Sequence, residues 1–325
     1  MSAARIPRPT EPRVVVAVAT WNGRHLLETF LPSVAAQRFR DFRLVVVDDA
    51  STDDTVAWLA ARWPEVEVVA LKVNGGVARA FNHCVRAAGT AEFIALFNND
   101  IELDPDCLGQ LVEALDAHPQ AGSAGAKLLN FYRRGELDGA GDTFDWAGTA
   151  TRRGHGERDR GQYDRPEAVF GACAGAALYR RSAFERVGLF DERFFAFFED
   201  VDWNFRAQMA GLSARYVPSA VAFHMGSATL GRGMTDFSHY QLTRNGIWIV
   251  AKDFPPRALL NHAPRIAYVQ VAQLVAALQA RRGRVWGRAV RDALRALPAV
   301  LRGRREVQAT RVVAVAELER AVAAR

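Results

Sequence analysis

Cysteine is scarce in this sequence of 325 residues. The three cysteines, Cys84, Cys107 and Cys173, form neither a CxxC pair nor a spacing typical of a metal site. Their number and arrangement exclude a disulfide-rich scaffold and a thiolate metal centre. We therefore expect three small, buried hydrophobic side chains in a protein of the reducing cytosol.

Long apolar runs are also missing. Residues 1–13 contain three prolines and no hydrophobic segment, and the apolar run at 14–19 has only six residues. The most apolar later stretch, 266–280, is interrupted by three glutamines and is shorter than the roughly 20 residues that a membrane-spanning helix needs. The sequence predicts a flexible N-terminus over 1–12, no signal peptide and no transmembrane helix.

Charge is unevenly distributed along the chain. The net charge is +6, but residues 257–325 hold 14 arginines and four acids, so this tail carries +10 and residues 1–256 carry −4. A basic pI for the whole chain would suggest nucleic acid as a partner. A basic, partly apolar tail on an acidic body fits an anionic membrane surface at least as well.

Strand and helix patterns alternate over the first hundred residues. Buried strands are predicted by continuous apolar runs at 14–19, 44–47, 66–71 and 92–97, and helical patterns lie between them. This alternation favours right-handed βαβ crossovers. The predicted fold is therefore α/β, with a mostly parallel, Rossmann-like sheet flanked by helices.

Two later segments depart from this alternation. Residues 130–168 are rich in Gly, Arg and Asp, which predicts a mobile loop or a small hairpin insert. From 256 to 325 the chain is Arg- and Ala-rich and helical in pattern, so we expect a basic, amphipathic helical tail without strands.

Polar loops directly follow the predicted strands. In open α/β sheets, ligands bind outside the carboxyl ends of the strands, so these loops would gather along one edge. Asp100 closes the fourth strand, and Mg²⁺ or Mn²⁺ needs only one or two carboxylates beside phosphate oxygens. Turn formation and helix capping are the alternative interpretation. The loops are Thr20-Trp21-Asn22, Asp48-Asp49, Asn74-Gly75-Gly76 and Asn98-Asn99-Asp100.

A second acidic cluster follows an aromatic run at 194–198. Glu199, Asp200 and Asp202 come directly after four phenylalanines. Aromatic surroundings raise the pKa of a carboxyl group toward the range of a general base. Helix capping and an i,i+4 ion pair with Arg206 explain Asp202 but fit Glu199 and Asp200 poorly.

Two basic positions lie further along the chain. His224 ends an apolar segment and is a candidate metal or diphosphate ligand, although a single histidine is more often structural. Arg244-Asn245 is either a phosphate-gripping pair or an ordinary pair on a helix surface. No convincing Ser/His or Cys/His set indicates a covalent nucleophile.

Together, in this order, these motifs resemble the family 2 inverting glycosyltransferases with the GT-A fold, and especially their rhamnosyltransferase-like branch. The resemblance covers residues 13–255 and includes Gly175-Ala176-Ala177-Leu178-Tyr179-Arg180-Arg181 and Phe198-Glu199-Asp200-Val201-Asp202-Trp203. It implies a nucleotide-sugar half over about 13–125 and an acceptor half over about 126–255.

The resemblance also assigns roles to individual residues. It implies that Asp200 is the general base, with Glu199 as the second candidate, and that Asp100 and His224 hold Mg²⁺ or Mn²⁺. Asn98 replaces the first carboxylate of the family's DxD motif, which leaves one carboxylate for the metal. Nucleotide-sugar contacts are implied for Thr20, Asn22, Asp48, Asp49, Asn74, Gly76, Asn98 and Asn99, and weaker roles at the diphosphate or acceptor for Arg244 and Trp203.

The implied activity is a single displacement. A base removes the proton from an acceptor hydroxyl as that hydroxyl attacks C1 of the sugar, while the metal stabilises the departing nucleoside diphosphate. The expected donor is dTDP-rhamnose or a UDP-sugar. The expected acceptor is a glycan or polyprenyl-linked glycan in the synthesis of cell-envelope polysaccharide.

The tail suggests where this chemistry takes place. Residues 281–305 contain nine arginines and one aspartate, interleaved with apolar residues at helical spacing. This pattern predicts an interfacial helix and a cytoplasmic enzyme held peripherally on the inner face of the cell membrane. The alternative is a helix that packs on the body or against a second copy in a homodimer.

Three other functions compete with this interpretation. The chain could be a nucleotide-sugar-binding module without turnover, or the tail could bind nucleic acid, although no recognised module supports that and we expect no nucleic-acid partner. A nucleotidyltransferase would be expected to show a Gly-rich, basic N-terminal loop, which residues 20–23 lack.

Overall fold

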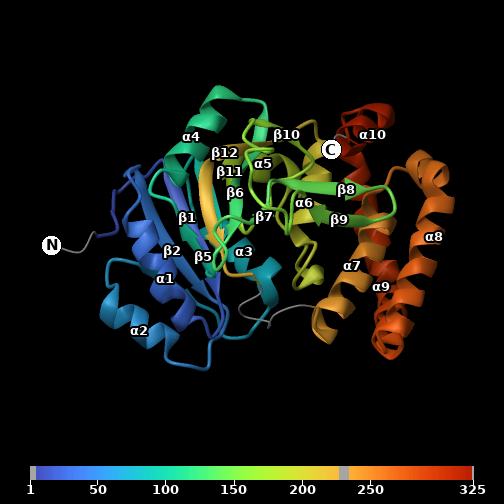
Figure 1. Ribbon diagram of the computed structural model, residues 1–325, viewed down its shortest axis with the longest axis horizontal. Coiled ribbons are helices and arrows are strands. Elements are labelled where there is room, and N and C mark those ends of the chain that lie inside the picture. Colours follow the sequence, from blue (N-terminus) through green and yellow to red (C-terminus); the bar gives the residue numbers. More distant parts are fainter. Residues whose placement is uncertain (1–4, 227–233, 324–325) are drawn as a thin grey trace.

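A computed structural model describes residues 5–226 and 234–323 (Figure 1). The first four residues of the predicted flexible N-terminus and the last two of the tail lie outside this range. Ile6 is buried in the core, so the described part of the N-terminus runs along the body of the protein.

The first half of the chain alternates strands and helices as predicted. Its elements are β1 (Val14–Thr20), α1 (Arg24–Ala35), β2 (Phe42–Asp48), α2 (Thr55–Arg62), β3 (Glu67–Ala70), α3 (Gly76–Ala87), β4 (Phe93–Asn98), β5 (Ile101–Leu103) and α4 (Cys107–Ala117). Strand β1 pairs in parallel with β2 and β4, and β2 pairs in parallel with β3.

The second half adds antiparallel strands to the same sheet. Strand β11 pairs antiparallel with β4 and β6, whereas β12 is parallel to β6. Ten of the described strands form one mixed sheet in the order β10-β12-β6-β11-β4-β1-β2-β3, with β5 on β12 and β7 on β6, and β8 and β9 form a separate two-stranded sheet. The elements of this second half of the chain are β6 (Ala121–Asn130), β7 (Leu137–Gly139), β8 (Asp142–Asp145), β9 (Thr149–Arg152), β10 (Glu167–Val169), β11 (Ala176–Arg180), α5 (Arg181–Val187), a 3-10 helix (Glu192–Phe194), α6 (Glu199–Met209) and β12 (Ser213–His224).

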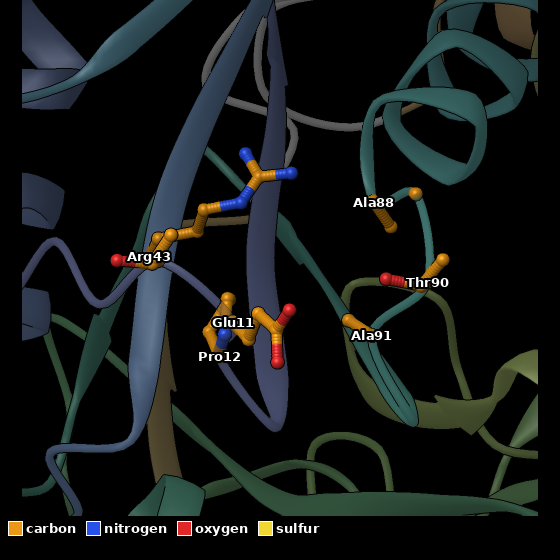
Figure 2. A pocket seen from close by; sticks show the side chains of 8 residues that line it. Glu11, Pro12, Arg43, Ala88, Thr90 and Ala91 are labelled. Atoms are coloured by element: carbon orange, nitrogen blue, oxygen red, sulfur yellow. The ribbon is translucent and has the colours of Figure 1, made fainter.

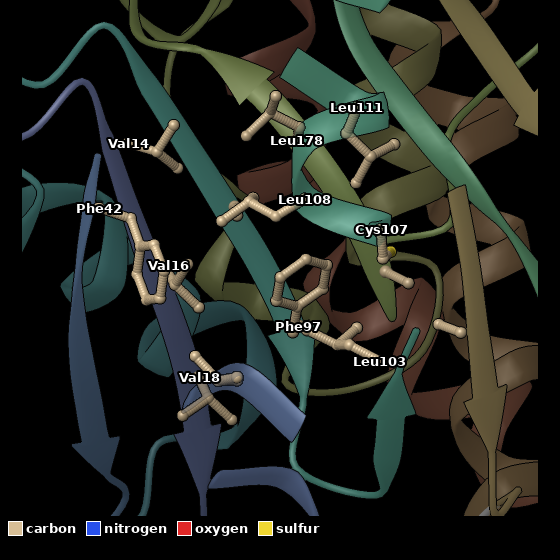
Figure 3. Packing of buried hydrophobic residues seen from close by; sticks show 14 of the residues in the cluster. Val14, Val16, Val18, Phe42, Phe97, Leu103, Cys107, Leu108, Leu111 and Leu178 are labelled. Atoms are coloured by element: carbon tan, nitrogen blue, oxygen red, sulfur yellow. The ribbon is translucent and has the colours of Figure 1, made fainter. Parts of the chain in front are cut away.

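The hydrophobic core covers both faces of the sheet. Val14, Val16 and Val18 alternate toward one face, where Leu108 of α4 packs (Figure 3). The intervening β1 residues point to the other face, which α3 covers through residues such as Phe81. Burial on both sides explains why β1 is continuously apolar. Cys84 and Cys107 are buried in this core, as expected.

The sequence predicted either a mobile loop or a small hairpin insert over residues 130–168, and the structure has a small hairpin there. Strands β8 and β9 pair antiparallel, and β7 joins the edge of β6. Phe144 and Trp146 of this hairpin pack on Phe205 of α6 and on Phe254. The aromatic contacts hold the hairpin against α6 and the residue that follows α7.

Four helices end the described chain: α7 (Asp236–Asp253), α8 (Pro256–Gln279), α9 (Gly283–Ala309) and α10 (Val315–Ala323). Helix α9 packs along α7, where the Trp248 indole N–H donates to the Ala293 carbonyl at 3.2 Å. Ala293 and Val300 are buried in this contact. The alternative interpretation of the tail, a helix packed on the body, therefore describes α9. None of the helices within the described residues has the length and apolar character required to cross a membrane.

Candidate active site

The parallel pairing brings the predicted loops to one edge of the sheet. Thr20 is level with Asp48 at the ends of β1 and β2, and Asn98 ends β4 beside Ala19. The Asn99 amide donates to the Thr20 hydroxyl at 2.9 Å. Parallel pairing therefore places the ends of these strands at one edge of the sheet, as predicted, and the side chains of Thr20 and Asn99 are in contact there.

Asn22 and Asp48 connect two of these loops. The Ser51 backbone N–H donates to Asp48 at 2.9 Å, and the Ser51 hydroxyl donates to the same carboxylate. The Asn22 side-chain oxygen accepts the Thr52 N–H at 2.8 Å. In this structure both residues shape the loops that surround the edge.

The turn at Gly75 and Gly76 is held by Asp49. Each glycine N–H donates to the Asp49 carboxylate at 2.9 Å, and burial raises the pKa of that carboxyl. These two N–H groups are therefore bonded within the protein, and the nucleotide-sugar contact implied for Gly76 stays a prediction. Asn74 lies half-buried just before them.

Asp100 and His224, the predicted metal ligands, are neighbours. Strand β5 pairs with β12 so that Ile101 is opposite His224. This register leaves Asp100 Oδ1 3.3 Å from His224 Nε2. Burial lowers the pKa of His224, but hydrogen bonds to Asp100 and Asp138 outweigh it and raise the pKa to about 9.

Asp200 and Glu199 lie at the N-terminus of α6. Asp200 accepts the backbone N–H groups of Ala174 at 3.2 Å and Val201 at 2.8 Å. Burial raises the pKa of both carboxyls, to about 8 for Glu199. At neutral pH Glu199 therefore holds its proton. The backbone donors stabilise the ionised form of Asp200 and make it the better base of the two.

The sequence analysis missed three charged residues that lie beside Asp200 or His224. The 130–168 segment contributes Asp138, Asp142 and Arg152, and one ligand atom from each of Asp142, Cys173 and Asp200 lies within 4.8 Å of the other two. Burial and the charge of Asp200 raise the pKa of Asp142, whereas Arg152 lowers it. Their only signal in the sequence was the Gly-, Arg- and Asp-rich composition of a segment expected to be a mobile loop or a small hairpin insert.

The prediction that Trp203 contacts diphosphate or acceptor is wrong. Its side chain is completely buried against Tyr179 and Phe184, and its indole N–H donates to the Gly188 carbonyl at 3.0 Å. The predicted ion pair between Asp202 and Arg206 is present at 2.9 Å. Trp203 and this ion pair are parts of the core.

Arg244 and Asn245 support the aromatic loop that precedes Asp200. The Arg244 guanidinium stacks on Trp248 and donates to the Phe194 carbonyl at 2.9 Å. The Asn245 amide donates to the same carbonyl at 3.1 Å and to that of Phe197 at 2.6 Å. Of the two roles considered for this pair, phosphate contact has no support here, because both side chains bind backbone.

A cavity of about 410 Å³ lies at the opposite edge of the sheet (Figure 2). Pro12, Arg43 and Ala91 line it near the amino ends of β1, β2 and β4. Arg43 is paired with Glu67 at 2.6 Å. This cavity therefore lies away from the carboxyl-end residues described above.

The family model for glycosyl transferase family 2 matches residues 15–188, more than half of the chain. N-acetylglucosaminyl-diphospho-decaprenol L-rhamnosyltransferase of Mycobacterium tuberculosis is 30% identical over 242 residues, which are 67% of this chain and 77% of that relative. O-antigen biosynthesis protein RfbC of Myxococcus xanthus is 29% identical over 69% of this chain and 18% of its own length. The chain belongs to glycosyl transferase family 2.

Solved structures show the same fold at low sequence identity. The mannosyltransferase PcManGT of Pyrobaculum calidifontis, in complex with GDP-Man and Mn²⁺, has a TM-score of 0.56 at 20% identity and covers 95% of this chain and 89% of its own. GalNAc-T7 with UDP, GalNAc and Mn²⁺ has a TM-score of 0.61 at 15% identity and covers 75% and 48%. The predicted GT-A fold is confirmed.

Proposed function

We propose that this protein transfers a sugar, with inversion at C1, from a nucleoside-diphosphate sugar to a hydroxyl of a lipid-linked glycan. The observation that carries the proposal is the half-buried carboxylate of Asp200, which backbone N–H groups orient at the start of α6. The name of the rhamnosyltransferase relative supports rhamnose as the sugar and a polyprenyl-diphosphate glycan as the acceptor, and we propose dTDP-rhamnose as the donor.

In the proposed reaction Asp200 takes the proton from the acceptor hydroxyl. The acceptor oxygen forms a new bond to C1 as the bond from C1 to the diphosphate oxygen breaks, and the nucleoside diphosphate leaves with that electron pair. A divalent cation held by Asp100 and His224 would stabilise the charge on the leaving group. Thr20, Asp48 and Asn99 line the edge at which the nucleotide would bind.

The test combines donor binding with turnover. Thermal shifts with dTDP, UDP and GDP, with and without Mn²⁺, identify the nucleotide. Transfer to a lipid-linked N-acetylglucosamine diphosphate is then followed by mass spectrometry. We expect the Asp200→Asn variant to bind donor as the wild type does and to lose about 10²- to 10⁴-fold in turnover.

Glu199→Gln is the matched control, because it changes the neighbouring carboxyl on the same helical turn. We expect it to keep most of its turnover at neutral pH. Normal turnover in Asp200→Asn with loss in Glu199→Gln would reverse the assignment. Donor binding without transfer in the wild type, across a panel of acceptors, would favour a binding module.

We further propose that the tail places the protein on an anionic membrane through α8, not through the apolar side of α9. Residues at i, i+3, i+7 and i+10 form one apolar face of α8, and this face is open: Tyr268, Val271, Val275 and Leu278 are 74%, 61%, 46% and 59% exposed. The arginines of α9 follow this face of α8 in the sequence. Each basic residue that touches an anionic surface contributes about 1 kcal/mol to binding.

A further inference from the structure

His224 lies between two carboxylates that come from distant parts of the chain. Its Nδ1 is 2.7 Å from Asp138 Oδ2, and its Nε2 is 3.3 Å from Asp100 Oδ1. Because Asp138 engages Nδ1, the imidazole ring is oriented with Nε2 toward Asp100.

Asp138 is itself held firmly. It is the central residue of β7, which pairs with β6 through Gly139 opposite Leu128, and its side chain is 4% exposed. Arg152 forms an ion pair with the same carboxylate and lies 3.4 Å from His224 Nδ1.

In this structure the 3.3 Å separation of Asp100 Oδ1 and His224 Nε2 is that of a hydrogen bond, and a cation shared by the two atoms would take the place of its proton. Adjacent ligands of an octahedral Mg²⁺ or Mn²⁺ with bonds of about 2.1 Å are about 3 Å apart, close to the 3.3 Å between Asp100 Oδ1 and His224 Nε2. A metal-binding histidine commonly donates its other ring N–H to a carboxylate, which sets the tautomer and the ring orientation. Asp138 is in the place of that carboxylate.

We propose that Asp138 is the positioning residue of a divalent-cation site formed by Asp100 and His224. This inference rests on the proposed function, which gives the cation its role. It assigns to the β7–β9 segment the task of orienting a metal ligand, in addition to placing Asp142 and Arg152 beside Asp200.

The test measures Mn²⁺ binding by electron paramagnetic resonance on the full-length protein, alone and with saturating dTDP or UDP. We expect Asp138→Asn to weaken Mn²⁺ binding by about 10- to 100-fold and His224→Gln to weaken it at least as much. Glu136→Gln is the control, because it changes a carboxylate two residues away that bonds to Arg133 and not to His224. It should bind Mn²⁺ like the wild type.

A double variant separates positioning from general damage to the fold. If Asp138 acts through His224, the Asp138→Asn/His224→Gln variant binds Mn²⁺ no more weakly than His224→Gln alone. Full additivity of the two losses would overturn the proposal, because Asp138 would then act independently. Thermal melts without Mn²⁺ confirm that each variant is folded.

Two further outcomes would also overturn it: Asp138→Asn binding Mn²⁺ like the wild type, or a wild type that binds no Mn²⁺ in either condition. Sugar transfer that continues in EDTA would leave the proposed function standing while the cation site failed. A wild type that binds Mn²⁺ but transfers no sugar would leave the cation site standing and contradict the proposed function.

Discussion

Asp142 and Asp200 bring carboxylate oxygens within 4.8 Å of each other, one from a β-hairpin and the other from the start of a helix. Arg152 is the cation that lowers the pKa of both. The proposed base is therefore the half-buried member of an acidic pair, and the charge of one arginine favours the ionised form of both carboxyls. This arrangement makes the pH dependence of turnover a direct test of the site.

Arg152→Met should shift the acidic limb of the pH profile upward. Removing the guanidinium takes away an interaction that lowers the pKa of Asp200, so a higher pH is needed to ionise the base. We expect kcat/KM to fall most at low pH and to recover partly as the pH rises. The control is Arg153→Met, because Arg153 pairs with Glu167 on another part of the segment. An acidic limb that stays in place would contradict the assignment of Arg152.

Glu199→Gln should stabilise the protein at high pH. The pKa of Glu199 rises from 4.5 to about 8 on folding, so the native state holds a proton that the unfolded chain releases between these values. Stability of the wild type should therefore fall as the pH rises through this window. Urea unfolding at pH 5, 7 and 9 should show that the free energy of unfolding of the variant increases relative to that of the wild type as the pH rises. A constant difference across the three values would contradict the shift.

Gly76→Ala should destabilise the protein more than Gly89→Ala. Both glycines have positive φ, +80° and +59°, which costs an alanine about 1–2 kcal/mol. At Gly76 a Cβ would also clash with the backbone carbonyl oxygen of Phe195 and lie 2.7 Å from its ring, whereas at Gly89 it would meet nothing within 4 Å. The two variants share the backbone strain, so the difference between their unfolding free energies isolates the Phe195 contact. Equal losses would show that this contact gives way easily.

Substituting Tyr268, Val271 and Val275 together by serine should release the protein from anionic vesicles. These side chains form the exposed face of α8 and have few contacts within the protein to lose, so thermal stability should change little. Flotation with phosphatidylglycerol vesicles measures the binding. The control replaces Val73 and Tyr132, which are exposed elsewhere on the body. Equal flotation of the two variants would contradict a specific role for α8.

The polar edge of the sheet could be predicted because its signals in the sequence are local. The apolar runs of β1, β2 and β4 end at Thr20, Asp48 and Asn98, and parallel pairing of consecutive βα units places such ends together. The second half of the site was harder to predict. Asp138, Asp142 and Arg152 reach Asp200 and His224 through antiparallel pairing and aromatic packing between segments far apart in the chain.

Trp203 was predicted to lie at the site, but tertiary packing places it in the core. The indole follows the acidic cluster by one residue, and its neighbours in the sequence are compatible with a binding role. Packing of α5 and the loop after it around α6 removes it completely from the surface. Sequence adjacency to Asp200 therefore did not predict adjacency to a ligand.

The sequence by itself determined the α/β architecture, the edge at which the polar loops gather, the acidic pair at 199–200 and the separation of an acidic body from a basic tail. These properties follow from short-range periodicity and composition. The tertiary structure decided which charges surround Asp200, which carboxylate orients His224 and which side of the tail meets α7. An amphipathic helix specifies that one side must be covered, but its partner depends on contacts that only the folded chain brings together.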